Sequence, residues 1–393
     1  MPIEFINREI ELQDLEKRWS SDSPELFVVY GKRRVGKTEL LKRFIQGKHA
    51  VYYLADQRTM ADQLSELARL VAEAFDDPSL IARGFKDWLN FFEYVQTHNR
   101  ERFVLVIDEF PYLTEVDSAT SSIFQKGWDE YLRKANVMLV ILGSSIAMME
   151  SEVLIQKSPL FGRRTGSLLL DPLTFQQSWQ FFPDKSFSDF LQLYAITGGM
   201  PAYILQMESG KTTKENIIQH IFPKTEFLHN EIEFVLREEL REPKNYLAIL
   251  RAIALGKRKL SEIVNDTGIE KPSVNKYLHT LSHLRIVERE LPITERHPEK
   301  SRKGLYRLQD IYFRFWFTYI FPYNSDLEIQ RYEEVLRKLD ESFILHTAFV
   351  YEEVCRELVG KWQDQVFPFE RVGKWWEKNE EIDLVTLNNS TKD

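Results

Sequence analysis

Residues 27–38, FVVYGKRRVGKT, constrain the fold of this chain more than any other segment. Four apolar residues indicate a buried strand, and Gly31 then starts a loop that ends in Gly36, Lys37 and Thr38 before the helical run ELLKRFI. This order of strand, G-x-x-x-x-G-K-T and helix is the context that a phosphate-binding loop requires. The two glycines let successive backbone N–H groups point toward an anion at a helix N-terminus. We therefore expect the chain to bind a nucleoside triphosphate.

Each part of the loop has an expected role. Lys37 is expected to reach the β- and γ-phosphates, and the Thr38 hydroxyl to hold Mg²⁺, so that the predicted cofactors are ATP and Mg²⁺. A chance strand, turn and helix is the competing interpretation, and the correct segments on both flanks argue against it. The expected nucleotide-binding residues of this loop are Gly31, Lys32, Arg33, Arg34, Val35, Gly36, Lys37, Thr38 and Glu39.

Length and composition limit the class of protein. A chain of 393 residues predicts two to four domains. The net charge of −8 argues against a uniformly basic nucleic-acid coat but allows local basic patches. Cys355 is the only cysteine, which excludes an internal disulfide framework and a Cys-based zinc site. We expect a cytoplasmic protein without a membrane segment, because the N-terminus lacks an apolar signal core and the apolar run around Arg314 is short.

The segment FVLVIDEFPYL, residues 103–113, is the second landmark. Its apolar start predicts a strand that is buried on both faces, as in a parallel sheet. Asp108 follows where a carboxylate would support Mg²⁺, usually through water, and Glu109 where a carboxylate would polarise the attacking water. Acidic pairs after strands are common, but the phosphate loop earlier in the chain favours the catalytic interpretation.

A third buried strand, within residues 137–145, delivers Ser144 and Ser145 to the same edge of the sheet. Ligands bind at that edge in α/β sheets, so one serine is expected to sense the γ-phosphate. Gly-Ser-Ser is also good turn chemistry, which is the alternative. Arg163 and Arg164 precede a further apolar strand. Either arginine could stabilise phosphate charge, in its own chain or in a neighbouring one, or could pair with a surface carboxylate.

From Pro172 the pattern changes to helices rich in Phe and Leu, interrupted by the turn TGGMPAYIL at residues 197–205. Pro201 is preset for the first position of a helix there. Residues 245–310 then predict three helices and two strand-like runs around the basic loop RHPEKSRK. Helix, helix-turn-helix and a basic hairpin together indicate a winged helix.

Winged helices bind DNA or other proteins, and the basic loop favours duplex DNA. A protein partner or a homo-oligomer stays open. In the third helix the apolar residues at helical spacing predict the buried face, and these are Val274, Leu278, Leu281 and Leu284. The expected DNA-contacting residues are Ser273, Asn275, Lys276, Arg296, Lys300, Arg302 and Lys303.

The tail, residues 311–393, begins with aromatic residues that are expected to pack under the winged helix. A following amphipathic helix carries Glu352, and a strand at residues 381–385 carries Asp383. The aromatic residues are Tyr312, Phe313, Phe315, Trp316 and Phe317.

Taken in order, GKRRVGKT, LVIDEFPYL, GSS, PLFGRRTGS, TGGMPAY, EELREPKNYLAIL and GKWWEKNEEIDLV resemble one family. It is the archaeal-type ATPase family, in which a signal-transduction, AAA-like ATPase is fused to a winged helix. A C-terminal domain of unknown function follows there, proposed to resemble restriction endonucleases. The resemblance covers essentially the whole chain. It implies an ASCE-type P-loop core and a helical lid, and a nucleotide contact from the turn that contains Pro201, although a plain helix–helix turn is the alternative.

The N-terminal segment FINREIEL resembles the adenine-side box of the same ATPases, which implies a nucleotide contact for Asn7 and Arg8. After these two residues, Ile10, Leu12 and Leu15 give a helix-like apolar face.

The fold that we expect is α/β, with a parallel P-loop sheet covered by helices on both faces. The expected domains are the ATPase core at 1–172, the helical lid at 173–243, the winged helix at 244–310 and an incomplete endonuclease-like α/β tail at 311–393. The expected function is ATP binding with slow hydrolysis that acts as a conformational switch. The alternatives are a DNA-binding regulator with nucleotide as a structural ligand, or an ATP-gated nuclease in a full-length form.

Nuclease activity is not expected of this chain. An endonuclease-like site needs an acidic residue such as Asp383 and a Glu-x-Lys on the next strand. The sequence stops after residue 393 without that motif. Cleavage would require another lysine, such as Lys374 or Lys378, to replace the missing one.

Overall fold

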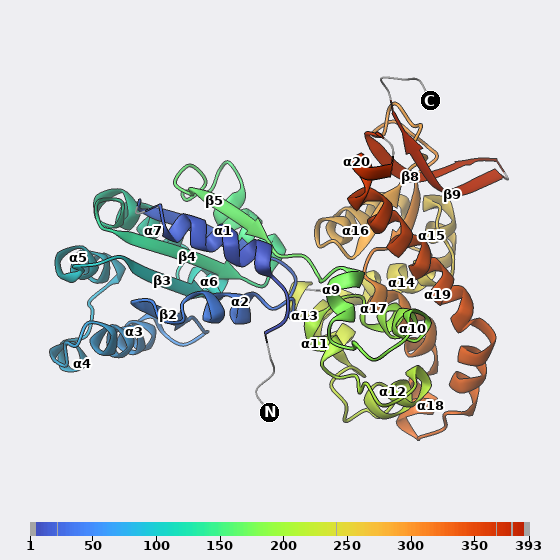
Figure 1. Cartoon of the computed structure of the whole chain (residues 1–393), viewed down its shortest axis with the longest axis horizontal. Helices are drawn as coiled ribbons and strands as arrows, with labels where there is room; N and C mark the ends of the chain where they lie inside the picture. Colours follow the sequence, from blue (N-terminus) through green and yellow to red (C-terminus); the bar gives the residue numbers. More distant parts are fainter. Residues whose placement is uncertain (1–4, 22, 241, 367, 379, 389–393) are drawn as a thin grey trace. The chain divides into compact units, whose positions relative to one another are not determined.

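The computed structural model describes residues 5–21, 23–240, 242–366, 368–378 and 380–388. The chain forms two compact units, Met1–Asp171 and Pro172–Asp393 (Figure 1). Among the described residues, no helix combines the length and apolar character needed to cross a bilayer.

Unit 1 is built on a five-stranded parallel sheet in the order β2-β3-β4-β1-β5. The strand β4 thus lies between β1, which leads into the phosphate loop, and β3, which ends in Asp108. This confirms the predicted α/β class with a parallel P-loop sheet. The strands are β1 (Glu25–Tyr30), β2 (Ala50–Leu54), β3 (Phe103–Asp108), β4 (Val137–Gly143) and β5 (Gly166–Leu169).

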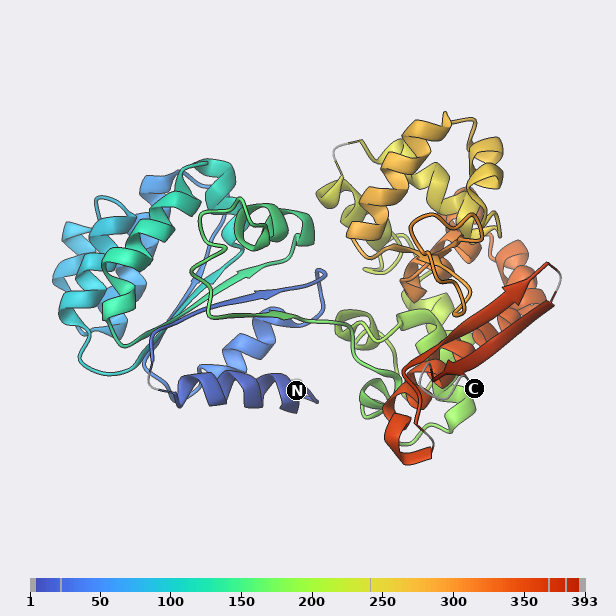
Figure 2. The same cartoon turned by 90° about the horizontal axis from the view of Figure 1, so that it is seen from above.

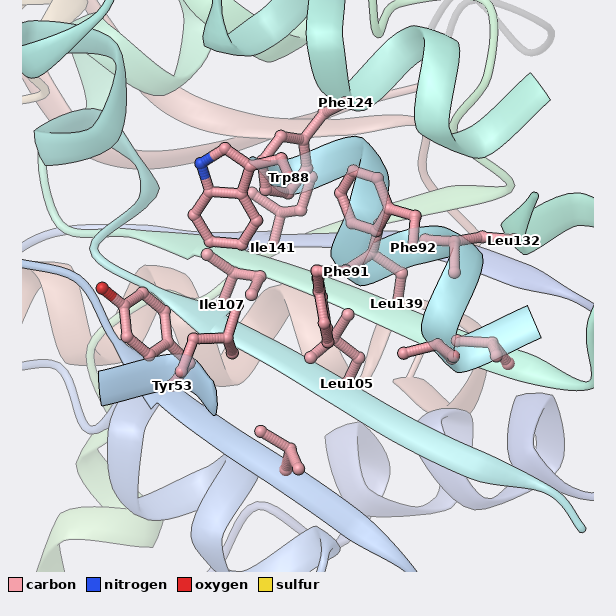
Figure 3. Close-up of a cluster of buried hydrophobic side chains, with 14 of the residues drawn as sticks. Tyr53, Trp88, Phe91, Phe92, Leu105, Ile107, Phe124, Leu132, Leu139 and Ile141 are labelled. Atoms are coloured by element: carbon pink, nitrogen blue, oxygen red, sulfur yellow. The ribbon is translucent and has the colours of Figure 1, made fainter. Parts of the chain in front are cut away.

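Helices cover both faces of this sheet, because the central strands β3 and β4 are apolar at every position but their last and are buried throughout. One face forms a large aromatic and aliphatic cluster in which Leu105, Ile107 and Ile141 of the strands meet Trp88 and Phe124 of the covering helices (Figure 3). The helices of unit 1 are α1 (Glu9–Trp19), α2 (Lys37–Phe44), α3 (Met60–Ala74), α4 (Ser79–Arg83), α5 (Trp88–His98), α6 (Phe110–Val116), α7 (Thr120–Glu130) and α8 (Ile146–Met149), with short turns at Leu132–Lys134 and Glu150–Leu154.

The other face lies against α1 and α2. Arg18 of α1 stacks over the ring of Phe27 with 4.4 Å between the guanidinium carbon and the ring centroid. In α1, Leu15 is fully buried as predicted. Ile10, a member of the predicted apolar face and the second residue of α1, is 77% exposed.

Unit 2 is mostly helical. Its first part, predicted as a helical lid, holds α9 (Phe175–Trp179), α10 (Phe187–Thr197), α11 (Pro201–Ile204), α12 (Thr213–His220) and α13 (Glu231–Glu239). The later helices are α14 (Pro243–Ala254), α15 (Leu260–Thr267), α16 (Lys271–His283), α17 (Ile311–Tyr319), α18 (Asn324–Glu328), α19 (Glu333–Lys361) and α20 (Gln363–Val366), with a short turn at Phe321–Tyr323.

The winged helix is present as predicted. It consists of α14, α15 and α16 followed by the antiparallel strands β6 (Val287–Glu290) and β7 (Leu305–Leu308). The four apolar residues predicted to face inward from α16 are all buried. The loop between β6 and β7 is the wing, seen in orange in Figure 2.

Helix α17 of the tail packs on α14 and β7 of the winged helix and on α10 of the segment predicted as the lid, and its predicted aromatic residues are all buried. The Tyr312 hydroxyl donates to the Leu228 carbonyl at 2.5 Å, and the Trp316 indole donates to the His229 carbonyl at 2.7 Å. The tail ends in an antiparallel hairpin of β8 (Arg371–Glu377) and β9 (Glu380–Leu387). The strand predicted at 381–385 is therefore present.

His346 of α19 is buried against the rings of Phe315, Tyr319 and Phe343. Its Nε2 lies 2.6 Å from the Ala195 carbonyl, so the neutral ring donates there. Burial, assisted by repulsion from Arg314, lowers the pKa of His346 from 6.5 to about 3.

His346 predicts a pH dependence of stability. The pKa of His346 is lower in the folded state than in the unfolded state, so below pH 6.5 the unfolded state binds a proton that the folded state does not. The free energy of unfolding is therefore highest above pH 6.5 and falls by about 1.4 kcal/mol per pH unit as the pH drops toward 3. His346→Gln keeps an N–H donor and cannot charge, so between pH 7.5 and 5.5 its unfolding midpoint should fall less than that of the wild type. The exposed His279→Gln serves as the control. Parallel pH profiles for wild type and His346→Gln would contradict this assignment.

Candidate nucleotide site and winged-helix face

The phosphate loop follows β1 and runs into the N-terminus of α2. Gly36 precedes the helix with a φ of 95°, and Gly31 has a φ of 150°. A Cβ atom at Gly31 would lie 2.4 Å from the Leu170 carbonyl oxygen, so a side chain does not fit there. Arg34 adopts a φ of 67°, and the loop therefore curls in the way that directs N–H groups inward.

Lys37 is buried and its ammonium group lies inside this loop. Nζ donates to the Gly31 carbonyl at 2.9 Å and to the Lys32 carbonyl at 3.0 Å. A buried cation in a curled loop that leads into a helix N-terminus makes the loop suited to an anion. Glu39, by contrast, is exposed on α2 and lies 3.6 Å from Lys42.

Asp108 and Thr38 meet at the carboxyl edge of the sheet. The Thr38 hydroxyl donates to Asp108 Oδ2 at 2.9 Å, and the Glu109 backbone N–H donates to Oδ1 at 2.9 Å. Two hard oxygen donors next to the phosphate loop are what Mg²⁺ requires when phosphates supply further ligands. The residues present therefore fit the predicted cation.

Glu109 is held by the neighbouring strand β4. Its Oε2 accepts from the Ser144 backbone N–H at 3.1 Å and from the Ser144 hydroxyl at 2.9 Å. Glu109 itself has a φ of 53°, a left-handed conformation that is uncommon outside glycine and typical of functional sites. Ser145 caps α8 by accepting from the Met148 N–H at 3.4 Å. Ser144 thus contacts Glu109 of the acidic pair.

Tyr52 of β2 is a site residue that the sequence analysis missed. Its hydroxyl donates to Asp108 Oδ2, the same oxygen that accepts from Thr38. Burial and the Asp108 carboxylate raise the pKa of the Tyr52 phenol, so it stays a neutral donor. Successive side chains of a strand point to opposite faces, so the sequence could have indicated that Tyr52 and Tyr53 face opposite sides of β2. It could not have indicated which side holds Asp108.

Arg163 and Arg164 lie at the opposite edge of the sheet. The Thr165 N–H donates to the Leu26 carbonyl at 2.8 Å, beside the start of β1, whereas the phosphate loop follows its end. Five residues of strand separate the two levels by about 17 Å. Arg163 pairs with Asp129 at 3.1 Å, as the surface-pairing alternative predicted. A role of either arginine on the phosphates of its own chain is therefore wrong, and only a role in a neighbouring copy stays open.

Asn7 and Arg8 are buried and both adopt left-handed conformations, with φ of 67° and 70°. The Arg8 guanidinium donates to the carbonyl of Val35 in the phosphate loop at 3.1 Å and to that of Asp171 at 2.7 Å. It also pairs with Glu11 at 2.9 Å. Arg8 thus joins the loop to the last residue of unit 1. An adenine contact by these residues stays a prediction.

The turn before Pro201 is anchored inside unit 2. The Leu173 N–H donates to the Gly199 carbonyl at 2.8 Å, and a Cβ atom at Gly199 would lie 2.0 Å from the Leu173 oxygen. Pro201 opens α11 as predicted. Its nucleotide contact stays a prediction.

A basic groove lies between the wing and the start of α16. It has a volume of about 630 Å³, and none of its lining residues is acidic. Asn275 and Arg302 were predicted to contact DNA, whereas Lys259, Lys271 and Arg289 were not. The lining residues are Lys259, Leu260, Ser261, Val264, Asn265, Lys271, Asn275, Arg289, Ser301, Arg302, Gly304 and Tyr306.

The other DNA-contact candidates lie around this groove. Lys276 is exposed on α16, and Ser273 is half-buried. In the wing, Arg296 and Lys300 are exposed, and Lys303 lies 3.5 Å from Glu377 of β8. Arg289 supports the wing, since its guanidinium donates to the Pro298 carbonyl at 3.1 Å and to the Ser301 carbonyl.

The endonuclease-like candidates of the tail come together around one lysine. Lys374 is buried and pairs with Glu352, and its Nζ lies 3.5 Å from Asp383. Lys378 has a φ of 55° and is exposed near the end of β8. Residues 389–393, the end of the stretch after which the Glu-x-Lys strand was predicted to be missing, lie outside the described residues. The absence of nuclease activity stays a prediction.

Comparison with known families gives three matches. Residues 5–207 match a family described as an ATPase domain predominantly from Archaea. The chain belongs to this family. Residues 244–291 match the IclR helix-turn-helix domain, and residues 316–393 match a family of archaeal and bacterial proteins of unknown function. These matches confirm the predicted resemblance.

Similar proteins extend over most of the chain. An uncharacterized protein of Methanocaldococcus jannaschii is 34% identical over 391 residues, which cover 99% of this chain and 85% of that protein. Among solved structures, a Walker-type ATPase of Pyrococcus abyssi has a TM-score of 0.62 at 20% identity and covers 80% of this chain and 96% of its own. The ORC2 protein of Aeropyrum pernix, in ADPNP–ADP complexes, has a TM-score of 0.53 at 13% identity, with coverage of 86% and 96%. Both structures share the fold.

The Arg8 contacts predict a stability effect. Arg8→Ala removes charged hydrogen bonds from two carbonyls, at a cost of about 2 kcal/mol. The unfolding midpoint of unit 1 should fall by about 4–8 °C, as expected for a unit of this size. Arg69→Ala removes an exposed pair with Glu66 and should change the midpoint by less than about 2 °C. Equal midpoints for the two variants in thermal melting would exclude the structural role of Arg8.

Proposed function

We propose that this chain binds ATP with Mg²⁺, hydrolyses it slowly and uses the nucleotide state to control a winged helix that binds duplex DNA. The observation that carries the proposal is the convergence of three groups at one edge of the sheet. Lys37 lies in the phosphate loop, Asp108 is bonded to Thr38, and Glu109 is bonded to Ser144. Phosphoryl transfer depends on this kind of positioning and charge stabilisation.

Each residue of the nucleotide site would have its own role in ATP binding and hydrolysis. Lys37 and the loop N–H groups bind the β- and γ-phosphates, and Thr38 and Asp108 hold Mg²⁺, which neutralises phosphate charge when bound. Glu109 accepts a proton from the attacking water. The Ser144 hydroxyl now donates to Glu109 at 2.9 Å, and it would turn to the γ-phosphate when ATP enters. Glu109 would then be released for the water.

The two candidate arginines have a different place in this proposal. Arg163 and Arg164 lie beyond reach of the phosphate loop of their own chain. They could act only on the nucleotide of a second copy, as an arginine supplied in trans.

A DNA-binding regulator with nucleotide as a structural ligand is the competing function. Such a protein has no need of a carboxylate beside the attacking water. The Glu109 carboxylate accepts two donors from Ser144, and its backbone is in a left-handed conformation; both observations favour hydrolysis instead.

Two substitutions test the ATP site. Lys37→Ala should abolish nucleotide binding or weaken it severely, because it removes the buried positive charge of the loop. Glu109→Gln should keep binding and lower turnover by about 10²–10⁴-fold, because it removes the base and preserves shape. Binding is measured by calorimetry and turnover by phosphate release.

Controls for both substitutions lie on the same helices. Lys42→Ala is an exposed change on α2, and Glu115→Gln is the same exchange on the exposed side of α6. Both should behave like the wild type. Full hydrolysis by Glu109→Gln would refute its role, and normal ATP binding by Lys37→Ala would refute the phosphate loop.

The basic groove supports the DNA-binding part of the proposal. It combines four Lys or Arg side chains with the N-terminal part of α16 and the wing, in a chain whose net charge is −8. Phosphate contacts of this kind position a winged helix on a duplex. The match to the IclR helix-turn-helix domain points to the same class of ligand.

Salt dependence tests the DNA contacts. The four wing residues predicted to contact phosphates are Arg296, Lys300, Arg302 and Lys303. If all four do so, the logarithm of DNA affinity should fall with the logarithm of salt concentration at a slope of about −3.6, a loss of about a hundredfold between 50 and 200 mM. Arg302→Ala should make the slope shallower by about 0.9, because one phosphate contact is lost. Lys224→Ala, an exposed change outside the groove, should leave the slope unchanged. No duplex binding at low salt would leave the groove as a protein-docking surface.

A further inference from the structure

Tyr52 and Asp108 lie side by side on adjacent strands. In the β2–β3 register Leu54 lies opposite Asp108, so Tyr52 is two residues before that level on the same face of β2. The Tyr52 hydroxyl donates to Asp108 Oδ2. Tyr52 is half-buried there, at the edge strand of the sheet.

The Asp108 carboxylate accepts from three donors on three different elements. Oδ2 accepts from Thr38 at the start of α2 and from Tyr52 of β2, and Oδ1 accepts from the Glu109 N–H. The torsion that turns a carboxylate about its own axis is soft. Donors on both oxygens are therefore needed to fix its plane. The Thr38 hydroxyl can bind a cation through its oxygen while its proton still goes to Asp108, and the Tyr52 phenol is a second donor to the same carboxylate oxygen.

The neighbouring residue Tyr53 has the same side chain and none of these contacts. It points to the opposite face of β2, where its hydroxyl donates to Gln63 Oε1 at 2.9 Å and its ring packs on Trp88. The two tyrosines thus differ in their surroundings and not in their chemistry.

We propose that Tyr52 is a positioning residue for Mg²⁺, whose phenol fixes the Asp108 carboxylate in the orientation that supports the cation beside Thr38. The inference rests on the proposed ATP-binding function and adds to it a residue outside the recognised motifs. Groups that orient a metal-binding side chain typically contribute 10–100-fold to metal affinity. Because the phenol touches neither the loop carbonyls nor Lys37 in these contacts, it should matter for the cation and not for the nucleotide alone.

The test compares Tyr52→Phe with Tyr53→Phe in the full chain. Binding of ADPNP is measured by calorimetry in EDTA and then over a series of Mg²⁺ concentrations. In EDTA both variants should bind within about twofold of the wild type. Tyr52→Phe should need 10–100-fold more Mg²⁺ to reach half of the gain in affinity, whereas Tyr53→Phe should need the wild-type concentration. Direct titration with Mn²⁺ by electron paramagnetic resonance should give the same ranking.

A double substitution separates positioning from a general structural effect. If Tyr52 acts through Asp108, then Tyr52→Phe should add nothing to the Mg²⁺ requirement of Asp108→Asn. Additive effects would overturn the inference, as would equal Mg²⁺ requirements for the two Phe variants or weaker binding by Tyr52→Phe in EDTA. These outcomes leave the proposed function intact. A wild-type chain that binds no ADPNP would instead overturn the proposed function, and this inference with it.

Discussion

The Asp108 carboxylate is the interaction on which the candidate site depends. It is the point where the phosphate-loop helix, the edge strand β2 and the start of α6 are joined, through Thr38, Tyr52 and the Glu109 N–H. A buried carboxylate is stable only when such donors compensate for lost water. The strand order makes the arrangement possible, because β4 lies between β1 and β3 and brings Ser144 to Glu109. The acidic pair is thus held from both neighbouring strands.

In unit 2 a second charge network fixes the winged helix to the tail. Glu290 of β6 is buried and accepts from Arg258 at 3.0 Å and from Arg356 of α19 at 3.1 Å. Arg307 of β7 donates to Glu288 and, at 2.9 Å, to Glu353 of α19. Breaking one member of a buried pair leaves an uncompensated charge at a cost of about 3–5 kcal/mol. These ion pairs therefore connect the wing strands, which lie beside the basic groove, to α19 of the tail.

The sequence predicted the helices and strands well, but it predicted poorly which side chains contact one another. The motif around Lys37 and the buried strand before Asp108 were sufficient for the sheet and for its ligand-binding edge, because their spacing is tied to backbone geometry. Tyr52 and Lys271 could not be found this way, since which strands and loops become neighbours depends on topology and not on periodicity. The position of Arg163 was readable in principle. A residue that precedes a parallel strand lies at the edge opposite the phosphate loop, and that alone excludes an action within its own chain.

Arg8 connects the phosphate loop to the last residue of unit 1. Its guanidinium bonds the carbonyl of Val35 within the phosphate loop and that of Asp171, after which the chain enters unit 2. The phosphate loop also contacts the end of unit 1 at Gly31, where a Cβ atom would collide with the Leu170 oxygen. The Val35 contact is buried and the Asp171 contact is partly buried, so the phosphate loop is packed against the end of unit 1. Under the proposed function, a shift of the loop on nucleotide binding would therefore be passed to Leu170 and Asp171, the last residues of unit 1. If the proposed switch operates, Arg8 is thus the residue that joins the phosphate loop to the end of unit 1.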